Sequence, residues 1–535
     1  MMLARRLIPV LIPALTAAIA LTGCTLAPRY ERPALPTPPS WPVGDAYLRQ
    51  SEAALPTVTY RDVFTDRRLQ AIIDQALPNN RDLRVAVANI EAARAQYRIQ
   101  RADLLPQVDA TGRYTYSQRG NGTGTTATSG TGNSGTGNSG TGTGGTGTGG
   151  TGTGGTGGGT GGGSSTGVGA VTTGSSGSSY AVDLGVTAFE LDLFGRVRSL
   201  TGAALDRYFA TEAAARATRL TLVGDIATAW VSYAADNSLL TIAQDTAASA
   251  QKSVRLTEAR LRGGIAPRTD LRQAQQILFT ANADLARQRT ALAQDVNALQ
   301  LLVGAPVDTA LLPSSIETAG ATIATLPAGL DSTILLRRPD VVQAEYQLRA
   351  TNAEIGAARA ALFPRISLTG LIGFASNALS SLFSGGAFNY SVAPSASYSI
   401  FNAGAGVANV RYSQAQRDAA LATYEKSIQS AFREIADALA RQGTIADQLR
   451  ANQNFVVAAD DTLTLTNARY RGGIDTFLTS LDAQRSYYSA QRTLVATQLT
   501  AATNKISLYQ ALGGDSLLDA PATGPAPATA TTTRP

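Results

Sequence analysis

A seven-residue motif occurs twice in this chain, each time between two long runs of helix-forming residues. Residues 259–265 read ARLRGGI, and 209 positions later (468 − 259) residues 468–474 read ARYRGGI. A Gly-Gly pair between helical runs is typical of the turn in a helical hairpin. The run before the first pair, Arg196–Arg262, contains no proline, and as a helix it would extend ~100 Å. We therefore predict two helical hairpins, the second with a long helix over residues 403–471.

The composition argues against several classes of protein. Beyond the N-terminus no uninterrupted apolar run is long enough to cross a bilayer as a helix. The net charge is +6, but the arginines are scattered among acidic residues, so we expect no binding to nucleic acid. Histidine is absent, which removes Ser-His-Asp triads and histidine metal sites, and no local motif places the two carboxylates of a glycosidase. We predict a protein that is not an enzyme and needs no cofactor or metal.

The N-terminus looks like the signal sequence of a bacterial lipoprotein. Arg5 and Arg6 precede an apolar segment, residues 7–20, that is too short to span a membrane, and Leu-Thr-Gly-Cys follows at residues 21–24. The resemblance implies removal of residues 1–23 and attachment of lipid to Cys24, and Thr25 in place of aspartate favours the outer membrane. An ordinary secretory signal is the alternative, but it would leave Cys24 as a free thiol without a partner. Several acyl chains on one residue would give a stable anchor.

Proline-rich sequence follows the cysteine. The segment 28–42 can form neither a helix nor a central strand, so residues 24–65 are predicted to be the lipid anchor and an extended arm. A helical pattern begins near Asp66 and is broken at Pro78. At the other end of the chain, residues 516–535 are predicted to be a disordered tail.

The hydrophobic period changes from helical to alternating in four segments of roughly ten residues. In each of them apolar or aromatic residues occupy every second position and polar residues lie between. The segments are 107–118, 180–188, 366–374 and 390–400. Their length fits a tilted transmembrane strand, although a soluble sheet with one face on a core shows the same alternation. Tyrosines near the strand ends and the predicted lipid anchor favour the membrane.

Four strands cannot close a barrel, and open sheet edges are not tolerated in lipid. Several copies must therefore share one barrel. Two copies would give eight strands with a filled interior, whereas three would give twelve strands and a lumen, and the polar strand faces favour three. The Gly/Thr/Ser-rich segment 119–179 between the first two strands is predicted to be a flexible loop. Such a barrel would place this loop outside the cell.

The second half of the chain repeats the first. Residues 105–112 correspond to residues 363–370, offset by 258 (363 − 105), and a proline marks the change from helix to strand both times. We place the first repeat at residues 66–325 and the second at residues 326–515. Apolar residues recur in both long helices at the 3-4 spacing of a coiled-coil seam. The predicted seam positions are Leu220, Val223, Ala227, Trp230 and Ala234, and Leu421, Tyr424, Ile428, Ala431, Ile435, Ala438, Gln442, Ile445 and Leu449.

Two helix-strand-strand-helix-helix units behind a lipoprotein signal resemble the outer-membrane factor family, the TolC-like exit ducts, and most closely its NodT or OprM type lipoproteins. The segments that carry the resemblance are FELDLFGRVRS (189–199), LRRPD (336–340), GAARAALFPRISL (356–368) and LDAQRS (481–486). The fold class it implies is mainly α-helical with a transmembrane β-barrel. Family members are homotrimers with four strands per chain, a twelve-stranded barrel in the outer membrane and a long α-helical barrel in the periplasm.

The function implied by the resemblance is that of a passive exit duct. In a tripartite efflux pump, such a duct receives drugs or other small solutes from an inner-membrane resistance-nodulation-division (RND) transporter and a periplasmic adaptor. Two other classes stay open. A duct for type I protein secretion has the same body, whereas a periplasmic scaffold lipoprotein would share the helical hairpins but should lack the four strands.

The resemblance places the Gly-Gly turns at the periplasmic end of the duct. In the family this end is closed at rest by contacts among tyrosine, aspartate and arginine residues. The matching residues are Tyr470, Asp482 and Arg485 in the second hairpin and Asp270 in the first. Because the first copy of the motif has leucine where the second has Tyr470, we expect the second hairpin to carry the gate. Three copies of Asp482 would form a ring of like charges; alternatively, Asp482 and Arg485 form an exposed pair with little effect.

The turns themselves are candidates for docking of the adaptor. Turn geometry is the alternative explanation for the glycines, which are needed in either case. The residues concerned are Arg262, Gly263, Gly264, Arg471, Gly472 and Gly473.

Overall fold

The computed structural model describes residues 25–42, 47, 59–117, 177–326 and 332–514, and it divides into two compact units. A helical unit comprises Met1–Pro106, Glu190–Ile366 and Ala396–Pro535, and a sheet unit comprises Gln107–Phe189 and Ser367–Ser395. The predicted signal sequence, Cys24, most of the loop 119–179 and the tail 516–535 lie outside the described residues.

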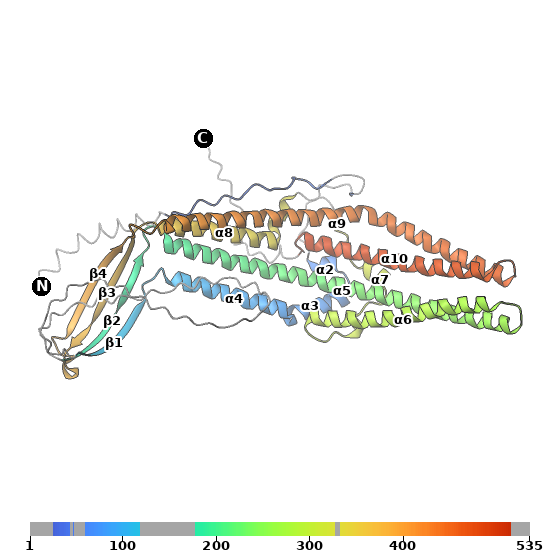
Figure 1. The fold of residues 1–535 in the computed structure, drawn as a ribbon, viewed down its shortest axis with the longest axis horizontal. Helices are drawn as coiled ribbons and strands as arrows, with labels where there is room; N and C mark the ends of the chain where they lie inside the picture. Colours follow the sequence, from blue (N-terminus) through green and yellow to red (C-terminus); the bar gives the residue numbers. More distant parts are fainter. Residues whose placement is uncertain (1–24, 43–46, 48–58, 118–176, 327–331, 515–535) are drawn as a thin grey trace, which may run out of the picture. The chain divides into compact units, whose positions relative to one another are not determined.

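The helical unit contains the two predicted hairpins, α5–α6 and α9–α10 (Figure 1). In chain order its helices are α2 (Tyr60–Val63), α3 (Arg67–Asn79), α4 (Arg81–Ala102), α5 (Arg196–Arg262), α6 (Arg268–Val303), α7 (Ile316–Ala321), α8 (Pro339–Ala360), α9 (Ala405–Arg471) and α10 (Phe477–Ala511), with short 3-10 turns at Thr309–Leu311 and Ser332–Arg337. The prediction for Arg196–Arg262 is confirmed to the residue. None of the helices within the described ranges is both long and apolar enough to cross a membrane.

Two details of the first helices differ from the prediction. The helical pattern does not break at Pro78, which lies in the last turn of α3; the break comes at Asn80, whose side-chain oxygen accepts a hydrogen bond of 2.9 Å from the backbone N–H of Leu83 and caps α4. The predicted arm also contains the short helix α2, which begins after Thr59. Thr59 and Asp62 form a reciprocal capping box there. Local capping thus sets both boundaries.

The sheet unit has four strands in the order β1-β2-β3-β4. They are β1 (Val108–Ser117), β2 (Gly177–Leu191), β3 (Arg365–Ser376) and β4 (Phe388–Ser397). The 3-10 turn Leu379–Ser381 lies between β3 and β4. β1 and β2 are antiparallel, and their register places Val108 opposite Val186 and Tyr114 opposite Tyr180, so apolar side chains share one face. The four predicted strands are confirmed, although β2 is longer than expected and β4 ends at Ser397 instead of residue 400.

The main core of the helical unit lies where both long helices meet the helices α3, α6, α8 and α10 and the segment after α6. Its largest buried side chains include Trp41, Phe64, Trp230, Tyr424 and Tyr509. Most predicted seam positions are buried, and Leu421, Gln442 and Leu449 are half-buried. The burial pattern supports the seam, because the 3-4 spacing keeps these side chains on one face of each helix.

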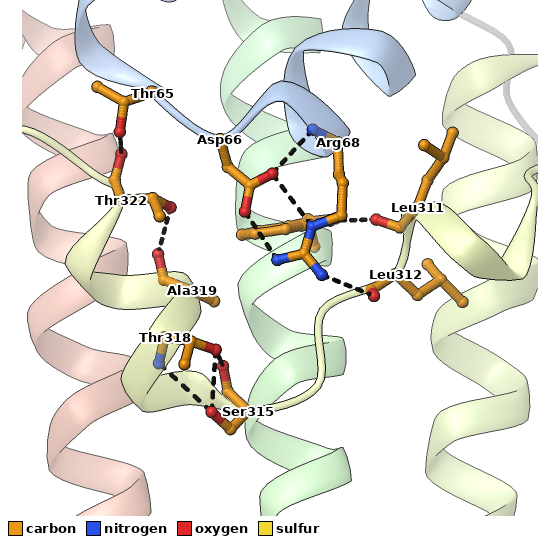
Figure 2. A network of polar contacts seen from close by, with 10 residues as sticks. Thr65, Asp66, Arg68, Leu311, Leu312, Ser315, Thr318, Ala319 and Thr322 are labelled. Atoms are coloured by element: carbon orange, nitrogen blue, oxygen red, sulfur yellow. Dashed lines mark hydrogen bonds and ion pairs between the residues drawn. The ribbon is translucent and has the colours of Figure 1, made fainter.

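Hydrogen bonds tie the start of α3 to the segment around α7 (Figure 2). The carboxylate of Asp66 caps α3 and accepts from the Arg68 guanidinium, which also donates to the carbonyl oxygen of Leu312. Thr65 donates through both its backbone N–H and its hydroxyl to the carbonyl oxygen of Thr322, at 3.0 and 2.8 Å. The first helices are therefore fixed to a segment more than 200 residues later in the chain.

The described part of the proline-rich arm lies along α8. The carbonyl oxygen of Pro28 accepts a hydrogen bond of 2.8 Å from the Asn352 side chain. Ala27 lies so close to Gly356 that a Cβ atom added there would be 2.6 Å from the Cβ of Ala27. Farther along, Arg32 donates to both carboxylate oxygens of buried Glu345, at 3.1 and 2.9 Å. The arm is thus held at successive turns of one helix face.

Candidate functional site at the hairpin turns

The two Gly-Gly turns have the same backbone structure. The N–H of Gly263 donates to the carbonyl of Ala259, and the N–H of Ile265 donates to Arg260, at 3.0 and 2.9 Å; the equivalent bonds in the second turn have the same lengths. The second glycine of each pair is left-handed, with φ of +73° at Gly264 and +74° at Gly473. These bonds satisfy carbonyl groups at the helix end, and the left-handed conformation requires glycine. The duplicated motif therefore encodes a specific turn.

Both turns lie at one end of the helical unit (Figure 1), which we call the tip, residues 259–268 and 468–477. Tyr470 does not project freely there: it is 7% exposed and belongs to a small hydrophobic cluster just inside the tip. Its ring lies 5.2 Å from that of Phe477, and the Arg260 guanidinium lies over it at 4.7 Å. The cluster contains side chains from both hairpins: Ala250, Val254, Ala274, Ile277, Leu278, Tyr470, Phe477 and Leu481.

The other predicted gate residues are not drawn into this cluster. Asp482 and Arg485 form an ion pair of 3.5 Å one turn apart on α10, with both side chains more than half exposed. Within a single chain this matches the description of an exposed pair with little effect on stability. Asp270 lies in the first turn of α6, where its negative charge interacts favourably with the positive end of the helix dipole. Among the described residues, no hydrogen bond or ion pair joins any of these three to Tyr470.

The candidate docking turns are open to solvent in the chain. Arg262, Arg471 and all four glycines are exposed, and the isoleucines that follow the glycine pairs are about as exposed, with Ile265 at 72% and Ile474 at 69%. Exposed isoleucine beside exposed arginine gives each turn an apolar contact point with a positive rim. Such a surface is suited to contact with another protein.

A second contact between the hairpins lies farther from the turns and was not predicted. The Tyr488 hydroxyl on α10 donates to the carboxylate of Asp284 on α6 at 2.7 Å, and Arg287 pairs with the same carboxylate at 2.8 Å. Burial, and then the hydrogen bond to Asp284, raise the pKa of Tyr488 to about 12, so it stays protonated and donates at neutral pH. Neither residue belongs to a repeated motif, so the sequence held no signal for this contact.

No group of His, Cys, Asp and Glu residues in the described part of the chain is arranged to hold a metal ion. The hairpin tip offers turns, an apolar cluster and arginines, which suit contacts between helices and with partners.

Comparison with known proteins decides the family. The family model described as "Outer membrane efflux protein" matches residues 72–144, 153–305 and 330–514. The chain belongs to the outer membrane efflux protein family. The resemblance drawn from the motifs is therefore confirmed.

Relatives of this outer membrane efflux protein cover almost the whole chain. It is 41% identical over 503 residues to the solvent efflux pump outer membrane protein SrpC of Pseudomonas putida, covering 93% of this chain and 97% of SrpC. It is 36% identical over 501 residues to the cation efflux system protein CusC of Escherichia coli K12, covering 93% and 97%. The crystal structure of the open state of the MtrE outer membrane channel of Neisseria gonorrhoeae has 32% identity and a TM-score of 0.75, with coverage of 92% and 98%.

Membership of this family places the protein in the outer membrane, as a channel component of an efflux pump. The family is one of transport proteins, and no catalytic family is indicated. The predictions for the gate and docking residues rest on the family resemblance together with the geometry above.

Proposed function

We propose that this outer membrane efflux protein works as a homotrimer, in which twelve strands close one transmembrane barrel and the helices form a tube in the periplasm. The observation that carries the proposal is the sheet order, because β1 and β4 are edge strands within one chain. Unpaired edges cannot remain in lipid. Pairing of β1 with β4 of another copy removes every edge, and three copies leave a lumen.

Helix α4 gives separate support for association of copies. In the part of the chain that the structure describes, none of its 22 residues is buried, although Val85, Val87 and Ile99 are apolar and 58 to 63% exposed. A helix whose apolar residues find no cover in its own chain is expected to bury them against a neighbour. The second copy of the same chain is that neighbour in the proposed tube.

The proposed trimer is a passive conduit. It receives drugs or other small solutes from an inner-membrane RND transporter through a periplasmic adaptor, and the transporter supplies the energy. Relatives that are named for pumps of solvents and of cations support efflux over type I protein secretion. The adaptor contacts the exposed turns at Arg262-Gly263-Gly264 and Arg471-Gly472-Gly473, and lipid on Cys24 adds an anchor.

The proposed gate comprises Tyr470 in the tip, Asp482 and Arg485 in α10, and Asp270 in α6. In a trimer, three Asp482 carboxylates would face one another across a narrow lumen and would attract cations. The support for Tyr470 is its position in a cluster that joins the two hairpins, since separation of the hairpins would have to disrupt it. In a trimer, Asp482, Arg485 and Asp270 would also meet residues of the other copies.

Two measurements test these proposals. Electron microscopy of the detergent-extracted protein should show a trimeric tube, and a compact monomer would refute the conduit. In planar bilayers, Asp482→Ala with Arg485→Ala should raise single-channel conductance. The matched control is Asp447→Ala with Arg450→Ala, which removes an exposed pair of the same spacing on α9, 2.9 Å apart. If the Asp482 and Arg485 variant changes conductance no more than the control, these two residues are not part of the gate.

A further inference from the structure

The two hairpin turns have the same backbone structure but differ in two side chains. These two side chains determine which group the turn's arginine contacts. The repeat offset of 209 pairs Arg260 with Arg469, Leu261 with Tyr470 and Ala266 with Asp475. The backbone agrees through the start of the next helix, where Pro267 has φ −73° and ψ 157° and Thr476 has φ −75° and ψ 157°. Differences in the arginine contacts therefore come from the side chains.

In the second hairpin the arginine is held by its own turn. Arg469 donates to both carboxylate oxygens of Asp475, with Nε to Oδ2 at 2.6 Å and Nη2 to Oδ1 at 3.0 Å. This bidentate hydrogen bond keeps the pKa of Asp475 below its ordinary value, so the carboxylate is charged at any physiological pH. Arg469 thus stays beside the turn and does not reach the first hairpin.

In the first hairpin the equivalent carboxylate is missing, because position 266 is alanine. Within the described ranges the Arg260 guanidinium has no hydrogen bond or ion pair, and it lies over the ring of Tyr470 at 4.7 Å. The Tyr470 hydroxyl is buried and has no hydrogen-bond partner among the described residues. The contact therefore uses the face of the aromatic ring and not its hydroxyl.

We propose that Arg260 is a positioning residue of the gate: freed by alanine at position 266, its guanidinium clamps the Tyr470 ring and holds the first hairpin to the second at the tip. Two differences between the repeats create this contact together. Tyr470, in place of leucine, supplies the ring in the second hairpin, and Ala266, in place of aspartate, leaves the first hairpin's arginine without a local carboxylate. The proposal rests on the gate function proposed for the tip and names the first hairpin's part in it.

The decisive variant is Ala266→Asp. Because the two turns have the same backbone, the new carboxylate should bind Arg260 as Asp475 binds Arg469 and so withdraw it from Tyr470. A cation–π contact at a partly exposed site corresponds to about a two- to fivefold change in an equilibrium. We expect Ala266→Asp and Arg260→Ala each to raise the open probability in planar bilayers by about two- to fivefold per contact. Arg268→Ala, the control at an exposed arginine just after the same turn, should match the wild type.

Two further variants separate this mechanism from others. Tyr470→Phe keeps the ring and removes only the hydroxyl, so it should gate like the wild type, whereas a gate that depends on a tyrosine hydrogen bond would open. Adding Ala266→Asp to Arg260→Ala should have no further effect if the aspartate acts only by capturing Arg260. Hydrogen exchange at residues 468–477 should increase in Ala266→Asp and Arg260→Ala but not in Arg268→Ala. This measurement reports release of the contact independently of channel recordings.

The outcomes distinguish the inference from the proposed function. If Ala266→Asp and Arg260→Ala both keep the open probability and the hydrogen exchange of the wild type, the role of Arg260 is overturned, even if the Asp482 and Arg485 variants open the channel. A gate that no tip variant opens would overturn both the gate and this inference. A wild-type protein that forms no channel at all would overturn the conduit itself.

Discussion

The contact between Ala27 and Gly356 allows a sharp test of how the arm is held, because the same substitution should release the arm at one helical glycine and leave it docked at another. Gly356→Ala adds a Cβ that would lie 2.6 Å from the Cβ of Ala27 and 2.7 Å from its Cα and N. Two of these three are backbone atoms of the arm, which cannot rotate away as a side chain can. Gly202 in α5 is the matched control, since a Cβ there meets nothing within 4 Å.

The size of the effect follows from the contacts. Replacing a helical glycine with alanine adds ~1 kcal/mol of helix stability, but this gain is the same with the arm docked or free and cancels from the docking equilibrium. Crowding of this kind costs ~1–3 kcal/mol, and displacement of the arm weakens the Asn352 hydrogen bond to Pro28, worth ~1 kcal/mol. Docking of the arm should therefore lose ~2–4 kcal/mol in Gly356→Ala and nothing in Gly202→Ala.

Limited trypsin digestion of the folded protein measures this loss, because cleavage of a transiently opened segment follows the population of the open form. Cleavage after Arg29, which Tyr30 follows, should become about 30-fold faster or more in Gly356→Ala. Gly202→Ala should be cleaved at the wild-type rate and have an unchanged or slightly higher thermal midpoint. Equal cleavage rates in all three proteins would refute the close approach of the arm to α8.

Two other predictions concern buried charge in the helical unit. Burial and the neighbouring Asp236 raise the pKa of Asp295 to about 6, above the unfolded value near 3.8. The folded protein therefore holds a proton that the unfolded chain has released, and this pair loses stability as the pH rises from about 4 to about 6. Asp295→Asn should remove that loss and stabilise the protein at pH 7.5 by ~1 kcal/mol after allowance for solvent; an unchanged difference in thermal midpoint between pH 5 and pH 7.5 would contradict it. Glu345→Ala should cost ~3 kcal/mol, because it leaves Arg32 and Arg349 without their buried carboxylate, and hydrogen exchange across residues 25–42 should rise; unchanged exchange would show that the ion pairs do not hold the arm.

Much of the fold could be predicted from the sequence, because its periods are long and its turn signals are strong. The helix Arg196–Arg262 ends where the glycine pair begins, and the four strands appear where the alternation does. The prediction failed in detail where short-range capping decides, as at Asn80 and Thr59. Such caps depend on the side-chain oxygen of one residue and leave no periodic trace.

The candidate site was harder to predict, since its contacts join residues that lie far apart in the chain. Tyr470 was selected through the family resemblance, but its burial against Phe477 and its contact with Arg260 depend on how the hairpins pack. Periodicity fixes which face of a helix is buried but not which residue of another hairpin meets it. The contact of Asp284 with Tyr488 was missed for the same reason.

The internal repeat nevertheless contained a signal for Arg260. Two segments that share a backbone act as each other's control: positions that agree, such as the glycine pairs, are required by the turn, and positions that differ are free to serve separate functions. Ala266 against Asp475 and Leu261 against Tyr470 are differences of this kind. Taken singly, alanine at position 266 has no evident meaning. Beside Asp475, it marks an arginine that has lost its local partner, and an arginine without a local carboxylate near a buried aromatic ring is expected to stack on that ring. Comparing the halves of a duplicated chain can therefore locate contacts between its hairpins before their packing is known.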